Sequence, residues 1–483
     1  MARRRLRDLI VVLPGITGSM LSRNGTPIWA PDPRLVGRAL TRPVRTVAAL
    51  DLAADLDGPD VVAYGLMPDV HLVPGLVKID GYTGLTGALR ERFEIVDAGP
   101  GTPGNLIEFP YDWRLDNRIS AQRLADVVEP ALAAWRRYAD IPDAQVIFIA
   151  HSMGGLVARY YLEVLQGWPT CRALITFGTP FRGAPQALEY LANGYKRLHL
   201  DLSAAMRSFP SVYQLLPIYP MVGIGGTFRR VADVPRLPNV DPDLAADGLR
   251  FHRELESAIA ANDTVAQHRY GLLPVVGTHQ PTFQSATFDG RRVTLGHVPP
   301  DGVDLYFDGG VDGDGTVPIA SAAPIDLSEV YTDKYHPESH SSLQVYPHVL
   351  NDLIGKLLKM QSTGLGRLRG AEPAAATAQP AVTLIVDDAY RSGEDVVIGA
   401  RWNGTDRRGV DMTAEITAVA DGSPRTADRS APPWDMKPTD EGWEMVLHDL
   451  PSGVHRVAVT ATGRAGLGAP PVHDVFDVVP GTP

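Results

Sequence analysis

Cysteine is almost absent from this sequence: Cys171 is the only one among 483 residues. A single thiol cannot form an intramolecular disulfide or a cysteine-based metal centre. Secreted folds that depend on disulfides are therefore excluded.

Long apolar runs are also missing. No segment approaches the roughly 20 apolar residues of a membrane span. The run Leu9–Leu13 ends at Pro14 and Gly15, and it is too short for the core of a secretion signal. The basic residues 3–5 before it are interpreted as a solvated terminus. We therefore expect a cytoplasmic protein, and we also consider transient peripheral association with a membrane surface.

Positive charge is in deficit. Lysine and arginine number 45 against 56 aspartate and glutamate residues, for a net charge of −11. A nucleic-acid partner is not expected, because binding phosphates requires an excess of positive charge. The 44% hydrophobic content is enough for a large core.

Up to about residue 362, short apolar runs alternate with amphipathic stretches. Expected strands are 9–13, 145–149, 172–177 and 272–277, and expected helices are 121–138, 155–165 and 345–358. Strands that alternate with helices predict a parallel sheet covered on both faces, the α/β class.

Composition divides the chain further. Residues 186–262 are rich in Leu, Tyr, Pro and Met without clear strands, which predicts a helical cap or lid insertion. Residues 366–381 form an Ala/Pro-rich linker. Short β-type runs then alternate with Asn-Gly, Asp-Gly and Ser-Gly turns, at 382–386, 396–402, 414–419, 443–447, 454–462 and 472–479. They predict an all-β immunoglobulin-like sandwich over 382–483, after a catalytic domain over 1–365.

Ser152 is the candidate nucleophile. An expected strand leads into Ala150-His-Ser-Met-Gly-Gly155, and an expected helix follows. This is the strand–nucleophile–helix turn of α/β-hydrolases, with small residues beside the serine because the turn is tight. Ala150 replaces the first glycine of Gly-x-Ser-x-Gly, a small change in size.

The acid should follow the nucleophile in the chain, after a later strand. Residues 312–318, Asp-Gly-Asp-Gly-Thr-Val-Pro, offer two carboxylates, and Asp314 is favoured over Asp312. The segment lacks the bidentate glutamate of a calcium loop, so the alternative is a simple turn.

The base should come last. His340, in a loop before the expected helix 345–358, is favoured, and His336 is the alternative. The other downstream histidines are expected on a helix face or on the surface of the sandwich: His348, His455 and His473. His336 and His340 have metal-ligand spacing, but Pro337 and the lack of a third ligand argue against a metal site.

An oxyanion needs two backbone N–H donors. Met153, directly after the nucleophile, is expected to supply one. The glycine-containing turn 14–19 is expected to supply the other. It lacks the pattern of a nucleotide-binding loop.

Together these motifs resemble the lecithin:cholesterol acyltransferase family, which includes lysosomal phospholipase A2. The similar segments occur in the family's order at 14–21, 109–114, 150–155, 177–183, 312–317 and around His340. Tyr111-Asp-Trp-Arg114 is the most distinctive of them. The resemblance covers about residues 8–360. It implies a triad of Ser152, Asp314 and His340, with Ile16 and Met153 as the oxyanion donors.

The sequence departs from the secreted members in lacking disulfides and in adding the C-terminal sandwich, which argues against lipoprotein substrates. The Tyr111-Asp-Trp-Arg114 segment has two open readings. It is a buried structural element, or Tyr111, Trp113 and Arg114 line the substrate pocket.

We expect an enzyme, a serine acyl hydrolase or O-acyltransferase of the lipase and phospholipase type acting on acyl-lipid esters. No cofactor or metal is expected, since a serine triad needs none. One alternative is an esterase or peptidase acting on polar soluble substrates. A second is an interaction protein that binds a partner through residues 382–483.

Overall fold

The chain is described here from a computed structural model, which covers residues 3–32, 35, 43–52, 61–69, 81–99, 101–197, 200–265, 270–300, 312–324, 335–362, 380–387, 389–404, 407–418, 433–463 and 469–479. Of the expected linker 366–381, all but residues 380 and 381 lies outside these ranges.

The largest sheet has six strands in the order β17-β14-β9-β8-β2-β7. Every neighbouring pair is parallel. The strands are β2 (Leu9–Leu13), β7 (Leu106–Glu108), β8 (Val146–His151), β9 (Cys171–Phe177), β14 (Gly271–Gly277) and β17 (Tyr335–His336). Parallel strands require crossover connections, and helices supply most of them. The class is thus mixed α/β, as the alternating pattern predicts.

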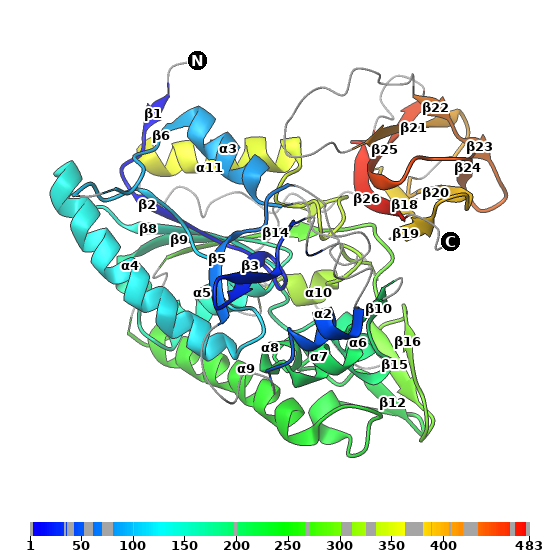
Figure 1. Ribbon diagram of the computed structural model, residues 1–483, viewed down its shortest axis with the longest axis horizontal. Helices are drawn as coiled ribbons and strands as arrows, with labels where there is room; N and C mark the ends of the chain where they lie inside the picture. Colours follow the sequence, from blue (N-terminus) through cyan, green and yellow to red (C-terminus); the bar gives the residue numbers. More distant parts are fainter. Residues whose placement is uncertain are drawn as a thin grey trace.

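Helices cover both faces of this sheet (Figure 1). On one side lie α4 (Asn117–Ala139), α5 (Met153–Glu163) and α9 (Pro242–Asp263); on the other lie α3 (Thr83–Arg92) and α11 (Pro347–Ser362). Strand β2 shows why both layers form. Leu9 and Val11 belong to the core under α4 and α5, whereas Ile10 and Val12 belong to the core under α3 and α11. Successive side chains point to opposite faces of a strand, so its uninterrupted apolar run serves two cores.

The insertion, residues 186–262, lies between β9 and β14 in the chain. Its helices are α6 (Pro185–Ala192), α7 (Ser203–Ser208), α8 (Pro210–Tyr213), η3 (Val231–Asp233) and α9. The expectation of no clear strands there is wrong. The structure contains β10 (Lys196–Arg197), β11 (Leu200–Asp201), β12 (Val222–Ile224) and β13 (Thr227–Arg229).

These strands have two or three residues each, too few to show an alternating pattern. A signal was nevertheless present for one hairpin. Gly225 and Gly226 connect β12 to β13, and both have positive φ, as the type I′ turns of two-residue hairpins require. The hairpin extends into a four-stranded sheet with β15 (Ser285–Phe288) and β16 (Val293–Gly296).

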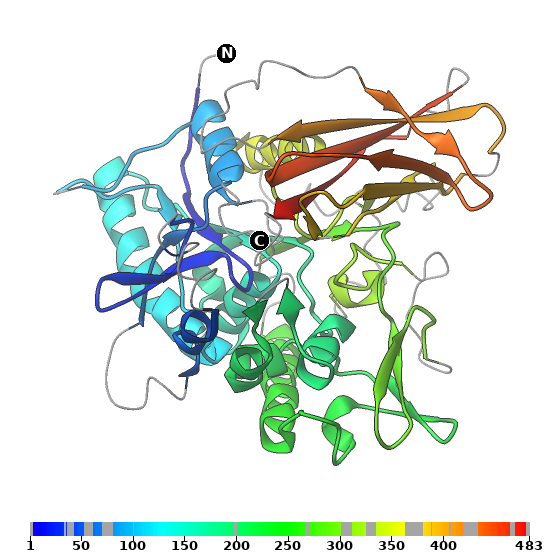
Figure 2. The same cartoon turned by 45° about the vertical axis from the view of Figure 1, so that its right-hand side comes forward.

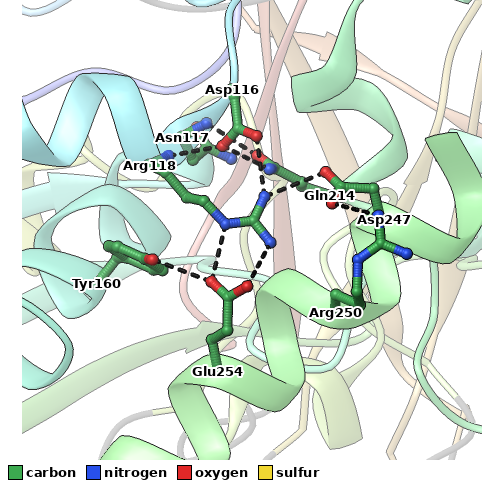
Figure 3. A network of polar contacts seen from close by, with 8 residues as sticks. All are labelled: Asp116, Asn117, Arg118, Tyr160, Gln214, Asp247, Arg250 and Glu254. Atoms are coloured by element: carbon green, nitrogen blue, oxygen red, sulfur yellow. Dashed lines mark hydrogen bonds and ion pairs between the residues drawn. The ribbon is translucent and has the colours of Figure 1, made fainter.

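A polar network fixes the insertion to the helical layer (Figure 3). Asp116 caps α4 by accepting from the N–H of Arg118. The Arg118 guanidinium then donates to Asp116, to Asp247 at 3.1 Å and to Glu254 at 2.8 and 2.9 Å. Tyr160 of α5 donates to the same Glu254 at 2.9 Å. The hydrogen bonds from Arg118 lower the pKa of Glu254. Arg118 therefore joins α4 to α9, and Glu254 of α9 joins both of them to α5 through Tyr160.

The remaining short elements surround the sheet. A three-stranded sheet has the order β4-β3-β5. Its strands and the other short elements are β3 (Ser19–Arg23), β4 (Thr26–Trp29), β5 (Val61–Leu66), β1 (Arg4–Arg5), β6 (Phe93–Glu94), α2 (Pro43–Ala48), η2 (Trp168–Thr170) and α10 (Ile319–Ala322).

The C-terminal unit, the described residues between 380 and 479, consists of two sheets facing each other (Figure 2). Their orders are β18-β20-β24-β23 and β19-β26-β25-β21-β22, and one apolar cluster lies between them. The strands are β18 (Val382–Ile385), β19 (Ala389–Arg391), β20 (Val396–Trp402), β21 (Val410–Ala418), β22 (Trp434–Asp435), β23 (Lys437–Pro438), β24 (Trp443–Leu447), β25 (Gly453–Gly463) and β26 (Val472–Val479). Each of the six expected β-type runs corresponds to a strand, and β20, β24 and β26 keep their expected bounds.

Among the residues the structure describes, none of the helices combines the length and the apolar character needed to cross a membrane.

Candidate active site

Ser152 lies between the end of β8 and the start of α5, as the motif predicts. Its backbone has φ 51° and ψ −125°, a strained conformation for a residue with a side chain. Two hydrogen bonds hold it there. The N–H of Ser152 donates to the carbonyl of Phe177 at 2.8 Å, and the Thr179 hydroxyl donates to the carbonyl of Ser152 at 2.9 Å. The tight turn presents the Ser152 side chain at the carboxyl edge of the sheet.

The structure brings Ser152, His340 and Asp314 together. His340 Nε2 is 2.9 Å from Ser152 Oγ, and His340 Nδ1 is 2.7 Å from Asp314 Oδ2. The three residues come from separate segments of the chain and are joined only by the fold. The Asp314 side chain is fully buried, so its charge faces His340 rather than water. This geometry allows proton transfer from the serine hydroxyl to the imidazole.

Asp314 is held in place by backbone donors. Its Oδ1 accepts from the N–H groups of Thr316 at 2.9 Å and Val317 at 2.7 Å. Its own carbonyl accepts from the N–H of His340 at 2.8 Å. Gly178 lets its backbone pack directly against the Asp314–His340 pair, because a Cβ there would lie 2.8 Å from both Asp314 Oδ2 and His340 Nδ1. The preference for Asp314 over Asp312 rested on its position before Gly-Thr-Val, and the amides that follow that glycine orient its carboxylate.

The turn that contains Ile16 lies against Ser152. A Cβ on Gly15 would be 2.9 Å from Ser152 Cβ, so only glycine permits this approach. Ile16 lines the same cavity as Ser152. Trp29 fixes the turn by donating to the carbonyl of Thr17 at 2.8 Å. Met153 is the first residue of α5, where N–H groups have no partner inside the helix. The two proposed oxyanion donors thus both lie next to Ser152, one in the turn packed against it and one directly after it in the chain.

His151 and Tyr82 form a chain of hydrogen bonds beside the site, which the sequence did not reveal. Gly15 N–H donates to the Tyr82 hydroxyl at 2.8 Å. His151 contacts that hydroxyl through Nδ1 at 2.9 Å and the carbonyl of His340 through Nε2 at 3.0 Å. A carbonyl only accepts, so Nε2 carries the proton and Tyr82 donates to Nδ1. Burial, with the His340 ring nearby, lowers the pKa of His151 to about 3, which keeps it neutral.

This chain of hydrogen bonds connects the turn next to Ile16 with the backbone of His340. His151 was visible in the motif beside Ser152, and its position there was the one available signal. Tyr82 lies 69 residues away from it in the chain, and no local pattern marked it.

The Tyr111-Asp-Trp-Arg114 segment is buried beside the site. Arg114 forms a two-pronged ion pair with Asp112 at 2.9 and 2.7 Å and donates to the carbonyl of Leu50 at 3.0 Å. The Tyr111 hydroxyl donates to the carbonyl of Pro14 at 2.8 Å. Trp113 donates to a backbone carbonyl of β3 at 3.1 Å.

Both readings of this segment describe part of it. Trp113 is among the residues that line the cavity, whereas Tyr111 and Arg114 are not. Their contacts fix the turn that contains Ile16 and the wall formed by Trp113.

The cavity above Ser152 has a volume of about 400 Å³. Most of its wall is apolar, and much of that wall comes from the insertion: Tyr190, Tyr195, Leu202, Ala205, Met206, Phe209, Val212 and Leu215. Trp29, Leu50 and Trp113 continue the apolar surface. Pockets that bind apolar ligands have this composition, with few polar groups near the reacting atoms.

The other candidate histidines lie elsewhere. His336 belongs to β17 and its carbonyl accepts from the N–H of Thr278 at 2.8 Å. His348 is exposed on α11. The expectation that His455 lies at the surface is wrong, because its ring stacks on Phe476 in the C-terminal unit and is 97% buried. His473 contacts Glu338, near the loop of His340. In the described part of the chain, no three His, Cys, Asp or Glu residues are grouped to hold a metal ion.

Comparisons with known proteins come from sequence and from structure. Residues 91–232 match the family model "Lecithin:cholesterol acyltransferase". No curated protein matches the chain.

Solved structures give weak matches. The Bacillus licheniformis lipase BlEst2 in its propeptide form has 11% identity and a TM-score of 0.32, covering 98% of this chain and 94% of that chain. Its mature form has 13% identity and a TM-score of 0.31, covering 74% and 94%. A PKD domain of an M14-like peptidase from Thermoplasmatales archaeon SCGC AB-540-F20 has 17% identity and a TM-score of 0.13, covering 21% of this chain and 92% of that chain.

The sequence match at 91–232 includes Tyr111-Asp-Trp-Arg114, Ser152 and the turn after β9, three of the segments that carry the resemblance. Over residues 91–232, the chain is thus similar to the lecithin:cholesterol acyltransferase family.

Proposed function

We propose that this protein is a serine acyl hydrolase or O-acyltransferase that acts on lipid-type esters. The observation that carries the proposal is the contact of His340 Nε2 with Ser152 Oγ at 2.9 Å, at the base of a mostly apolar cavity of about 400 Å³. The contact provides an activated hydroxyl, and the cavity suits a hydrocarbon chain.

In the proposed mechanism, His340 accepts the proton of Ser152 as its oxygen attacks the ester carbonyl. Asp314 keeps His340 Nδ1 protonated and stabilises the imidazolium that forms. The N–H groups of Ile16 and Met153 bind the oxyanion. The carbon–oxygen bond of the ester then breaks, His340 gives its proton to the leaving alcohol, and an acyl-serine remains. Water or a second alcohol resolves it by the same steps in reverse.

The proposal extends to the architecture. The parallel sheet with Ser152 after β8 supports an α/β-hydrolase fold for residues 1–365, with residues 186–262 as its cap. The two facing sheets support an immunoglobulin-like sandwich for residues 382–483, after the linker 366–381. A cytoplasmic location, with transient contact to a membrane surface, remains our proposal and is tested by cell fractionation.

The decisive experiment compares the full-length protein with Ser152→Ala. Each is incubated with membrane lipids, and the lipids are analysed by mass spectrometry, with a fluorophosphonate probe as a second readout. We expect loss of probe labelling and a fall in turnover of about 10⁶-fold, since triad residues act as a unit.

Equal lipid changes by the two proteins, or equal labelling, would refute the assignment of Ser152. Turnover of short soluble esters without any change in membrane lipids would favour an esterase for polar substrates. If neither protein turned over any ester, the C-terminal unit as a binding module would become the better hypothesis.

A further inference from the structure

The C-terminal unit forms part of the cavity that contains Ser152. Leu384, Ile385, Val386 and Asp474 line this cavity together with Ser152 and His340. Ile385 is 41% exposed although it belongs to a strand whose neighbouring residues are buried. An apolar side chain left this open at a cavity wall is available to contact a ligand.

Strand β18 is fastened to the segment that orients the acid. Thr383 Oγ1 donates to the carbonyl of His279 at 2.6 Å, and the N–H of Leu384 donates to Gln280 Oε1 at 3.3 Å. The backbone of Gln280 exchanges two hydrogen bonds, of 3.0 and 3.2 Å, with Gly313. Gly313 directly precedes Asp314. The position of β18 is therefore fixed relative to Asp314 through two intervening residues, Gln280 and Gly313.

The start of β26 is fastened to the loop that bears the base. Ser339, next to His340, donates to the carbonyl of His473 at 3.2 Å. His473 Nδ1 is 3.1 Å from Glu338 Oε1, and the Glu338 side chain is fully buried. Tyr346 donates to the carbonyl of Pro471 at 2.8 Å. The C-terminal unit thus contacts both loops that position the reacting groups.

We propose that the C-terminal unit forms the alcohol side of the ester site and selects esters whose alcohol carries a long hydrocarbon chain. This rests on the function proposed above. In that reaction the oxyanion lies beside Ile16 and Met153, while His340 must reach the oxygen of the leaving alcohol to protonate it. The alcohol therefore lies on the side of His340, and the wall next to the His340 loop belongs to the C-terminal unit.

The cavity walls formed by the insertion and by the C-terminal unit differ in polarity, which fits an acyl chain at the first and an alcohol at the second. The insertion offers the larger apolar surface, including Leu202, Met206 and Phe209, which suits the acyl chain. The part of the wall at the C-terminal unit combines the apolar residues 384–386 with the polar groups of Asp474 and of Gln280, to which β18 is hydrogen-bonded. Such a surface can contact the polar oxygen end of the alcohol with its polar groups and the hydrocarbon chain with its apolar groups. When an alcohol acts as the acceptor, it enters on this same side and gives its proton to His340 as its oxygen bonds to the acyl carbon. His340 then returns a proton to the Ser152 oxygen as the acyl–serine bond breaks.

The test is Ile385→Trp in the full-length protein, with Val397→Trp as the matched control. Val397 is also 41% exposed and lies in the same sheet, but it does not line the cavity. Two ester series are compared: one acid esterified to methanol or dodecanol, and one alcohol esterified to acetic or dodecanoic acid. Thermal unfolding of each variant shows that it is folded.

We expect Ile385→Trp to lower the kcat/KM ratio of dodecyl to methyl ester about tenfold, since overfilling a packed apolar site typically costs more than 1 kcal/mol. The ratio for the acid series should change little, and Val397→Trp should change neither ratio. An unchanged alcohol ratio, an equal effect of both variants, or an effect on the acid series alone would overturn the proposal.

A binding measurement separates this proposal from the proposed function. If the wild-type protein hydrolysed no ester, the proposed function would fail. Binding of dodecanol, followed by tryptophan fluorescence, would then decide the inference. Weaker binding by Ile385→Trp than by Val397→Trp would support an apolar subsite at the C-terminal unit. Equal binding, or none by the wild-type protein, would overturn it.

Discussion

Replacing Arg114 by methionine should destabilise the protein severely. The guanidinium and the Asp112 carboxylate are 1% and 3% exposed, and two hydrogen bonds of 2.9 and 2.7 Å join them. Methionine fills much of the same volume but leaves Asp112 as a buried charge without its cation. Removing one partner of a buried ion pair costs about 3–5 kcal/mol. The carbonyl of Leu50 also loses its donor at 3.0 Å.

The assay is thermal unfolding followed by calorimetry, where a loss of this size lowers Tm by about 3–5 °C in a chain of this length. The double variant Asp112→Asn with Arg114→Met provides the control. Asparagine removes the stranded charge but keeps an oxygen that can accept from the N–H of residue 114, which Asp112 Oδ1 accepts at 3.1 Å. We expect it to recover at least half of the loss.

A change of less than about 1 kcal/mol for Arg114→Met would contradict this reasoning, because it would mean that water or another cation compensates Asp112. A double variant no more stable than the single one would also refute it. The cost would then come from packing and not from the unpaired charge.

Three further predictions concern the site itself. Asp314→Asn should lower kcat about 10⁴-fold while the fold is kept, because His340 loses the acceptor that fixes its tautomer. An unchanged kcat in steady-state assays would exclude Asp314 as the orienting acid. Gly15→Ala should lower kcat about 10²-fold with a smaller change in KM, because the added Cβ would lie 2.9 Å from Ser152 Cβ and displace the turn of Ile16. Gly87→Ala is the control, since no atom lies within 4 Å of the Cβ added there. His151 titrates at about pH 3 in the folded chain and near 6.5 when unfolded, so the unfolded state binds the extra proton between these values and stability falls as the pH decreases through that window. Urea unfolding at several pH values should therefore show a slope smaller by about 1.4 kcal/mol per pH unit for His151→Gln, and an unchanged slope would contradict a buried neutral histidine.

The sequence was most informative where one periodicity filled a whole element. Residues 9–13 and 146–150 are uninterrupted apolar runs, and such runs identify strands buried on both faces. Helix α4 has an apolar stripe and an aspartate cap, so its existence could be predicted, although it begins four residues before the expected start at 121.

The residues proposed as the triad could be located because each one lies in or beside a recognisable segment: Ser152 in an elbow, Asp314 before a Gly-Thr-Val turn and His340 in a loop before a helix. The residues that hydrogen-bond to the segments around these three could not be predicted from the sequence. Tyr82, Gln280 and Glu338 act through contacts with residues distant in the chain, and such contacts leave no local periodicity or spacing. The contribution of residues 384–386 to the cavity was hidden for the same reason, because a β-type run does not indicate what its strand faces.

The contacts of the C-terminal unit have a consequence for protein synthesis. A ribosome synthesises Ser152, Asp314 and His340 before β18 and β26, which follow later in the chain. A nascent or prematurely terminated product would therefore carry the reacting groups in a site open on one side, without the wall of residues 384–386. Full selectivity would appear only once the last strand has emerged and docked.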